Sequence, residues 1–337
     1  MKTLSDALQR AWYGGALWFW PLLVLLWPLS VLYTWLAARR RRRLQEHCQP
    51  PPVPVIVVGN ITVGGTGKTP LLCALAQQLT ARGLRVGIIS RGYGGSHRSA
   101  PRLVSATDSA AVVGDEPLLL ARTSACPVVI GRDRAAALAT LLAAAEVDVV
   151  LSDDGLQHYA LPRTVEIAVL DAARGLGNGL CLPAGPLREP ASRLAEVDFV
   201  VTNGEPANIF RPDQWHAVLQ PVAWVAVASG VLQPLQQFAE GTMVHALAGI
   251  GHPQRFFGTL RALGLQVIEH PFADHHAFTP ADLQFADGLP VVMTEKDAVK
   301  CAPFAPANCH ALRVQMVLPA GWLDALLARM NENYGRH

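Results

Sequence analysis

The 337-residue chain is long enough for two domains, and with 51% hydrophobic and 16% charged residues it can bury a substantial core. Its formal net charge is only +2, and Arg39–Arg43 supply five of the positive charges, so the basicity is local and argues against a broad nucleic-acid-binding surface. The six cysteines are scattered without a C-x-x-C pair, which indicates neither a zinc site nor a disulfide framework.

The N-terminal segment has no charged residue from Ala11 to Ala38 and holds five of the eight tryptophans. As one helix this run would be about 42 Å long, against about 30 Å for the hydrocarbon core of a bilayer. Pro21 and Pro28 would kink or interrupt it, and Arg39–Arg43 would lie at the anionic cytoplasmic face. We expect residues 1–47 to be a membrane anchor that spans the bilayer or lies in one leaflet, and disfavour a cleaved signal peptide or a buried soluble helix.

A phosphate-binding loop is predicted next. The apolar run at residues 54–60 indicates a buried strand, and helical apolar spacing begins at Lys68 and stops at Gly83. Between them lies the pattern Gly-x4-Gly-Lys-Ser/Thr with Thr in place of the first Gly. The loop residues are Thr62, Val63, Gly64, Gly65, Thr66, Gly67, Lys68 and Thr69.

In this strand–turn–helix context, backbone N–H groups and the helix N-terminus would bind the phosphates of a nucleotide. Lys68 would reach the β- and γ-phosphates, and the Thr69 hydroxyl would bind Mg²⁺. A glycine-rich turn with an incidental lysine is the alternative, which the agreement of strand, turn and helix disfavours.

The remaining pattern alternates strands and helices, as in a parallel sheet flanked by helices. We expect a phosphate-loop NTPase-like α/β core at residues 48–230 and a smaller C-terminal α/β domain at residues 231–337, with the boundary near 225–240. Strands are expected at residues 85–90, 126–131, 147–154, 165–172, 198–204, 242–250, 265–270 and within 290–300, and helices at 132–147, before Gly264 and from Thr279.

Charged side chains follow several of these strands, where ligands bind in such sheets. Asp153 and Asp154 end an apolar strand in the arrangement that holds Mg²⁺ opposite the loop threonine, although Asp also caps helices. Asp115 and Glu116 precede a helix, so they are either capping charges or a base and a metal ligand. Arg91 follows a strand in SRGYGGS, either as part of a plain loop or as a donor to an anionic group.

Taken together, the motifs GNITVGGTGKTP, SRGYGG, GDEP, SDDGLQH, GPLREP, HALAGIGHPQRFF, DHHAF and MTEKDAVK resemble the tetraacyldisaccharide 4′-kinase family of Gram-negative bacteria, from the anchor to about residue 300. Thr62 is no departure within that family. The resemblance implies transfer of the γ-phosphoryl group of ATP to the 4′-hydroxyl of a tetraacylated disaccharide 1-phosphate, giving lipid IVA in lipid A biosynthesis. It also implies an inner-membrane protein with its catalytic domains on the cytoplasmic face.

By the same resemblance, Asp115 is the general base and His275 supports it, while Glu116, Asp153 and Asp154 organise Mg²⁺ in a division left open. Arg188 and Arg91 are expected to meet the 1-phosphate or the sugar of the lipid substrate.

Two other classes of function are weighed against this kinase. One is a membrane-associated GTPase or ATPase targeting factor, and a GTPase would need an Asn-Lys-x-Asp guanine motif, which TNGE and TEKD do not match. A non-enzymatic scaffold would have a degenerate phosphate loop, whereas Lys68, Thr69 and Asp153 are intact.

Overall fold

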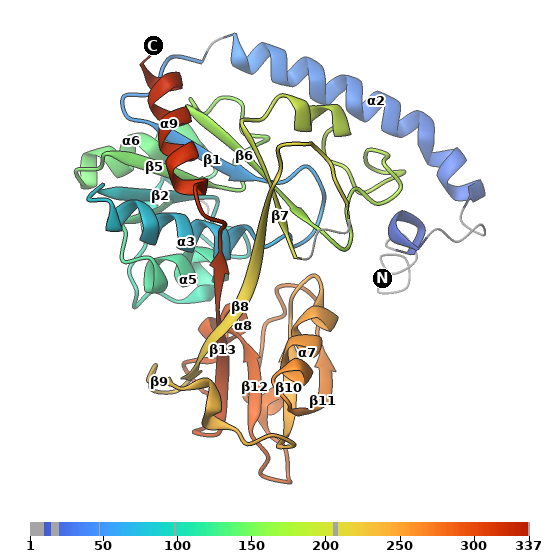
Figure 1. The fold of residues 1–337 in the computed structure, drawn as a ribbon, viewed down its shortest axis with the longest axis vertical. Helices are drawn as coiled ribbons and strands as arrows, with labels where there is room; N and C mark the ends of the chain where they lie inside the picture. Colours follow the sequence, from blue (N-terminus) through green and yellow to red (C-terminus); the bar gives the residue numbers. More distant parts are fainter. Residues whose placement is uncertain (1–9, 15–19, 47, 98, 205–207, 336–337) are drawn as a thin grey trace.

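The computed structural model describes residues 10–14, 20–46, 48–97, 99–204 and 208–335. It contains two α/β units joined by two long strands, β8 (Trp215–Ala226) and β13 (Cys309–Val317), which run between them in Figure 1. The strand order is β11-β10-β12-β13-β8-β7-β6-β1-β5-β2-β4-β3, with β9 (Leu232–Gln233) paired to β8. This arrangement confirms the expected phosphate-loop α/β fold with a smaller α/β unit.

The first unit is built on buried parallel strands rich in Val and Ile, whose apolar side chains pack between helices on both faces. These strands are β1 (Val55–Gly59), β2 (Val86–Ser90), β4 (Val128–Ile130), β5 (Val149–Asp153), β6 (Val165–Asp171) and β7 (Phe199–Asn203), with β3 (Arg102–Leu103) antiparallel at the edge. Helices α3 (Lys68–Ala81) and α5 (Asp115–Thr123) pack on one face of the sheet, and α6 (Arg134–Ala144) packs on the other. Short helical segments lie at Ala110–Val113 (α4) and Ala191–Ala195 (η2).

The second unit has its own core, formed by β10 (Met243–Ala248), β11 (Gln266–Pro271), β12 (Val291–Thr294) and part of β13. Helices α7 (Pro253–Ala262) and α8 (Glu295–Cys301) and the short η3 (Leu235–Gln237) complete it. The helix expected from Thr279 was wrong, because only a 3-10 turn, η4 (Pro280–Leu283), forms there. Leu283 and Phe285 turn inward while Gln284 is exposed, and this alternation suits extended chain after the turn.

The C-terminal helix corrects the expected extent of the second unit. Helix α9 (Trp322–Tyr334) packs on the first unit, where Trp322, Leu326 and Met330 join the same core cluster as the β1 and β6 side chains. The side chain of Asn333 also donates to the Thr164 carbonyl oxygen at 2.8 Å. Residues 231–337 therefore do not all belong to the smaller unit, because β13 carries the chain back to the first one.

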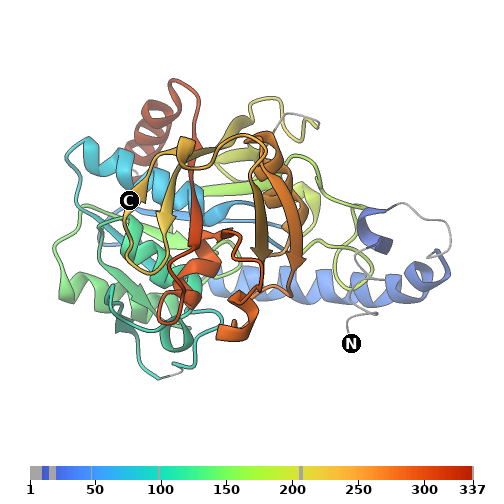
Figure 2. The same cartoon turned by 90° about the horizontal axis from the view of Figure 1, so that it is seen from below.

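Helix α2 (Trp20–Gln45) runs along the outer side of the first unit, away from the second (Figures 1 and 2). It passes through Pro28 without a break and begins next to Pro21, so neither proline interrupts it. Among the described residues it is the one helix long and apolar enough to cross a membrane. Residues 1–9 and 15–19 of the expected anchor lie outside the described part of the chain.

Candidate active site

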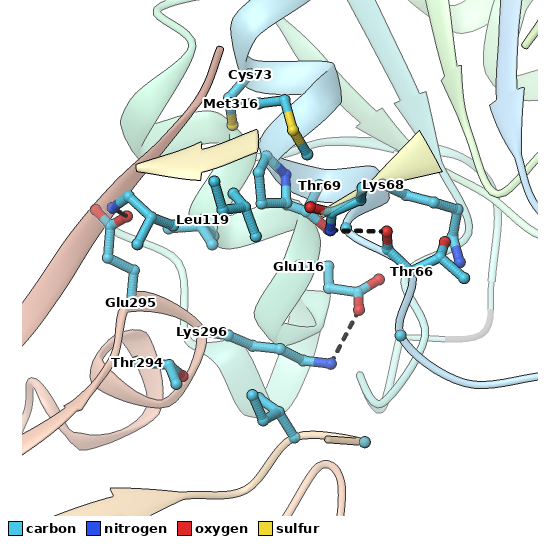
Figure 3. A pocket seen from close by; sticks show the side chains of 18 of the residues that line it. Thr66, Lys68, Thr69, Cys73, Glu116, Leu119, Thr294, Glu295, Lys296 and Met316 are labelled. Carbon is cyan, nitrogen blue, oxygen red and sulfur yellow. Dashed lines mark hydrogen bonds and ion pairs between the residues drawn. The ribbon is translucent and has the colours of Figure 1, made fainter. Parts of the chain in front are cut away.

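A cavity of about 740 Å³ opens between the two units at the carboxyl ends of the first unit's strands. Its wall combines the phosphate loop, the ends of β5 and β7, the start of α5, and residues of α7, α8 and β13. Figure 3 shows Thr66, Lys68 and Thr69 close together on one side of this cavity, with Lys296 of α8 reaching toward Glu116. The cavity is therefore lined by residues from distant parts of the chain.

The predicted phosphate loop connects β1 to α3. Gly64 and Gly67 have φ angles of 100° and 91°, in the left-handed region that favours glycine. Thr62 instead forms an isolated antiparallel β-bridge with Leu187, and the Val63 N–H donates to the Pro186 carbonyl oxygen at 2.9 Å. Glycine is not required at position 62, because the chain is paired with a neighbouring segment there.

Lys68 lies at the start of α3, beside a carboxylate from the end of β5. Its Nζ is 3.4 Å from Asp154 Oδ1, and Arg188 Nη1 donates to Asp154 Oδ2 at 3.0 Å. Burial alone would raise the pKa of Asp154, but Lys68 and Arg188 lower it well below its usual range. These three side chains form one ion-paired group, with Lys68 at the mouth of the phosphate loop.

Asp153 differs from its neighbour. Its Oδ2 accepts a hydrogen bond from the Ser90 hydroxyl at 2.9 Å, whereas its Oδ1 is buried without a hydrogen-bond partner in the structure. Burial and the negative charges of Glu116 and Asp154 raise the pKa of Asp153. A cation beside these carboxylates would offset that repulsion.

His275, which lines the cavity, meets the buried Asp115 although 160 residues separate them, with His275 Nδ1 3.0 Å from Asp115 Oδ2. Asp115 is the first residue of α5, not part of a strand-end loop, and its Oδ1 accepts the Glu116 N–H at 2.9 Å. Burial would raise the pKa of Asp115, but His275 and Lys296 lower it overall, and the Asp115 hydrogen bond raises the pKa of His275. This carboxylate–imidazole pair has the geometry of a proton acceptor oriented by a neighbouring base.

Arg91 and His276 lie near this pair in the chain or in the cavity but take no part in it. Arg91 lines the same cavity, at the end of β2. The neighbour of His275, His276, instead packs against Phe272 and contacts Asp282 at 3.4 Å, which is a structural role.

Sequence reasoning missed three polar side chains that join the units. Lys296 Nζ donates to Glu116 Oε1 at 2.9 Å, so the second unit contacts the start of α5. Arg255 of α7 donates to Asn203 Oδ1 at 2.7 Å, and Asn203 Nδ2 in turn donates to the Thr66 carbonyl oxygen at 3.0 Å. The available signal in the sequence was position, because Asn203 ends a strand and Lys296 lies two residues after one.

A phosphate loop between β1 and α3, acidic residues at the end of β5 and a carboxylate–histidine pair facing them define a phosphate-loop enzyme of the phosphotransfer class. Comparison with known proteins identifies the group within that class. The family model described as tetraacyldisaccharide-1-P 4′-kinase (LpxK) matches residues 22–331, and the chain belongs to this family.

Curated relatives agree with this assignment. The chain is 50% identical over 330 residues to the tetraacyldisaccharide 4′-kinase of Alcanivorax borkumensis, an alignment that covers 98% of each chain. It is 52% identical over 334 residues to the enzyme of the same name from Azotobacter vinelandii, covering 97% of this chain and 98% of that one.

A solved structure is also similar, namely LpxK from Aquifex aeolicus in complex with ATP. The two chains are 28% identical with a TM-score of 0.77, and the match covers 92% of this chain and 99% of the other.

Proposed function

We propose that this chain transfers the γ-phosphoryl group of ATP to the 4′-hydroxyl of a tetraacyldisaccharide 1-phosphate, forming lipid IVA. Family membership and the ATP complex of the Aquifex relative support the reaction. The observation that carries the proposal is that the phosphate loop and His275 line one cavity, with His275 hydrogen-bonded to the buried Asp115. The first unit supplies the loop, and the second supplies His275.

In the proposed mechanism, the N–H groups of the phosphate loop and Lys68 bind the phosphates and stabilise charge that develops during transfer. Asp115 accepts the proton of the attacking hydroxyl, and its lowered pKa keeps it ionised near neutral pH. The hydrogen bond from His275 orients the carboxylate.

Mg²⁺ is the proposed metal cofactor, with Thr69 and the carboxylates of Glu116, Asp153 and Asp154 as the candidate ligands. Among described residues no cluster of three His, Cys, Asp or Glu side chains forms a complete metal site. Mg²⁺ is commonly held by one or two carboxylates together with phosphates and water, which are donors of the kind present at this site. The buried Asp153 Oδ1 without a partner fits a ligand role, whereas Asp154 is already paired with Lys68 and Arg188. When bound, the ion would neutralise phosphate charge.

The acceptor is proposed to lie on the Arg188 side of the cavity. Arg188 keeps one ion pair with Asp154 and is partly exposed, and Arg91 lines the same wall. A guanidinium group matches the oxygens of a phosphate, so these two residues are proposed to contact the 1-phosphate or the sugar.

Helix α2 is proposed to hold the enzyme at the cytoplasmic face of the inner membrane, embedded in one leaflet. Its outward face exposes large apolar side chains, including Val24, Leu25, Trp27, Leu32 and Leu36. Its inward face is docked on the first unit near its middle, at Ser30. A helix that crossed the bilayer upright would place this polar contact at mid-membrane, which is unfavourable.

Phosphorylation of the lipid by purified full-length protein tests the proposed reaction. Radiolabelled ATP or GTP is supplied with tetraacyldisaccharide 1-phosphate in mixed micelles, and labelled lipid is measured. We expect transfer from ATP by the wild type, and a decrease of several orders of magnitude in Lys68→Ala. Arg82→Ala is the matched control, because it removes a cation that is ion-paired with Asp324 on the exposed surface.

The nucleotide decides between the proposed kinase and the alternative targeting factor. Hydrolysis of GTP in preference to ATP without lipid phosphorylation would favour the targeting factor. Full transfer by a folded Lys68→Ala enzyme would contradict the proposed role of the phosphate loop.

A further inference from the structure

Helix α2 is joined to the enzyme by hydrogen bonds as well as by apolar packing. Ser30 is only 4% exposed, and its hydroxyl donates to the Cys181 carbonyl oxygen at 2.7 Å and accepts the Ala184 N–H at 3.0 Å. One turn further on, the Tyr33 hydroxyl donates to the Arg188 carbonyl oxygen at 3.0 Å. Both side chains lie within the uncharged run, yet both face the protein.

The segment that receives these bonds is part of the cavity. The Arg188 N–H donates to the Ile61 carbonyl oxygen at 2.7 Å, and Leu187 pairs with Thr62 at the start of the phosphate loop. The Arg188 side chain points the other way, into the cavity, where it pairs with Asp154 at 3.0 Å. The main chain of Arg188 is therefore held between Ile61, just after β1, and Tyr33 of α2, which restricts where its guanidinium group can lie.

A helix that served only as a tether would not need these hydroxyl groups. Membrane binding depends on the outward apolar face, and removing a hydroxyl would make the helix more apolar. The inward stripe repeats at helical spacing, with Ser30 buried and Tyr33, Ala37 and Arg41 half-buried. Arg41 extends the docking by pairing with Glu196 and lying over the Tyr159 ring.

We propose that α2 positions the acceptor side of the active site, with Tyr33 acting through the main chain of Arg188 and Ser30 through Cys181 and Ala184 of the same segment. The helix then has two separate functions on two faces, lipid contact outside and alignment of Arg188 inside. This inference rests on the proposed function, in which Arg188 meets the lipid acceptor.

The test compares full-length Tyr33→Phe and Ser30→Ala with wild type in mixed micelles. We expect kcat/KM for the disaccharide acceptor to fall about five- to tenfold, because each variant loses about one hydrogen bond that aligns this segment. The KM for ATP should be unchanged. The membrane-bound fraction should not fall. Tyr334→Phe is the matched control, because its hydroxyl also donates to a main-chain carbonyl oxygen, that of Pro52 at 2.9 Å, outside both α2 and residues 181–188, and it should behave as wild type.

Hydrogen–deuterium exchange of residues 181–188 provides a readout that does not depend on activity. Exchange in this segment should be faster in Tyr33→Phe and Ser30→Ala than in Tyr334→Phe at equal melting temperature. Unchanged exchange together with unchanged acceptor kinetics would overturn the inference, as would losses that merely follow the membrane-bound fraction. Failure of the wild type to phosphorylate the acceptor would instead refute the proposed function, and the exchange data would still decide whether α2 orders this segment.

Discussion

Replacing Asp115 by Asn isolates the chemical role of this carboxylate, because the side chain keeps its shape and loses its basicity. In the structure Asp115 is 4% exposed and its Oδ2 lies 3.0 Å from His275 Nδ1. An amide at that position still accepts a hydrogen bond through its oxygen, so we expect the fold and the binding of ATP to be retained. A positioned general base typically contributes about 10²- to 10⁴-fold in rate, and kcat should fall by that amount.

The energy of the hydrogen bond between Asp115 and His275 sets the size of the effect expected in the double mutant. A hydrogen bond to a charged group contributes about 1.5–3 kcal/mol, and both side chains are buried enough for this range to apply. If His275 acts through Asp115, the Asp115→Asn/His275→Ala double mutant should lose less than the sum of the single losses, by about ten- to a hundredfold. Single-turnover transfer from labelled ATP gives the chemical step, and equilibrium nucleotide binding gives the control.

The pair also predicts a pH dependence of stability. The pKa of His275 is raised above its ordinary value of 6.5, so its contribution is fully present below pH 6.5 and is lost as the pH rises through the raised pKa. The pKa of Asp115 is lowered below 3.8, so its contribution is present above pH 3.8 and is lost as the pH falls through the lowered pKa. Asp115→Asn should therefore reduce the free energy of unfolding most between about pH 4 and 6.5.

Three results would refute this reasoning. They are wild-type kcat in a folded Asp115→Asn enzyme, strictly additive losses in the double mutant, and an unfolding difference that is the same at pH 5 and pH 8. Additive losses would indicate that Asp115 only supplies negative charge to the first turn of α5 and that His275 lies beside it without a functional connection.

Three further predictions concern the loop, the contact between the units and the anchor. Gly67→Ala should lower the free energy of unfolding by about 1–3 kcal/mol and weaken ATP binding. The reason is that Gly67 has a φ of 91° and a Cβ there would lie 2.2 Å from Asn203 Nδ2. An unchanged melting temperature would contradict this. Lys296→Ala should raise the pKa of His275 in an NMR titration, since the lysine charge lowers it, whereas Lys296→Arg should not. Deleting residues 1–38 should release part of the protein from membranes and weaken activity on lipid in bilayers, and unchanged fractionation with unchanged activity would exclude an anchor.

The features that could be predicted from sequence are those recorded in neighbouring residues. A β-branched run, a glycine-rich turn and an apolar helix stand next to one another from Val55 to Ala81, and that local order is enough to predict the phosphate loop. An uncharged run followed by five arginines likewise predicts a long apolar helix. The strands at residues 86–90 and 149–153 are short buried Val- and Ile-containing runs, so their character is also local.

Only the tertiary structure decided what these elements bring together. The 3.0 Å contact between Asp115 and His275 requires β8 and β13 to carry the second unit over the first, and no local pattern records that path. The same return along β13 places α9 on the first core, against the expected division of the chain. The face that α2 turns toward the protein is set by the carbonyl groups of residues 181–188, since apolarity alone would suit either face. Local propensity thus determines which elements form, while long-range hydrogen bonds and packing determine which of their side chains meet.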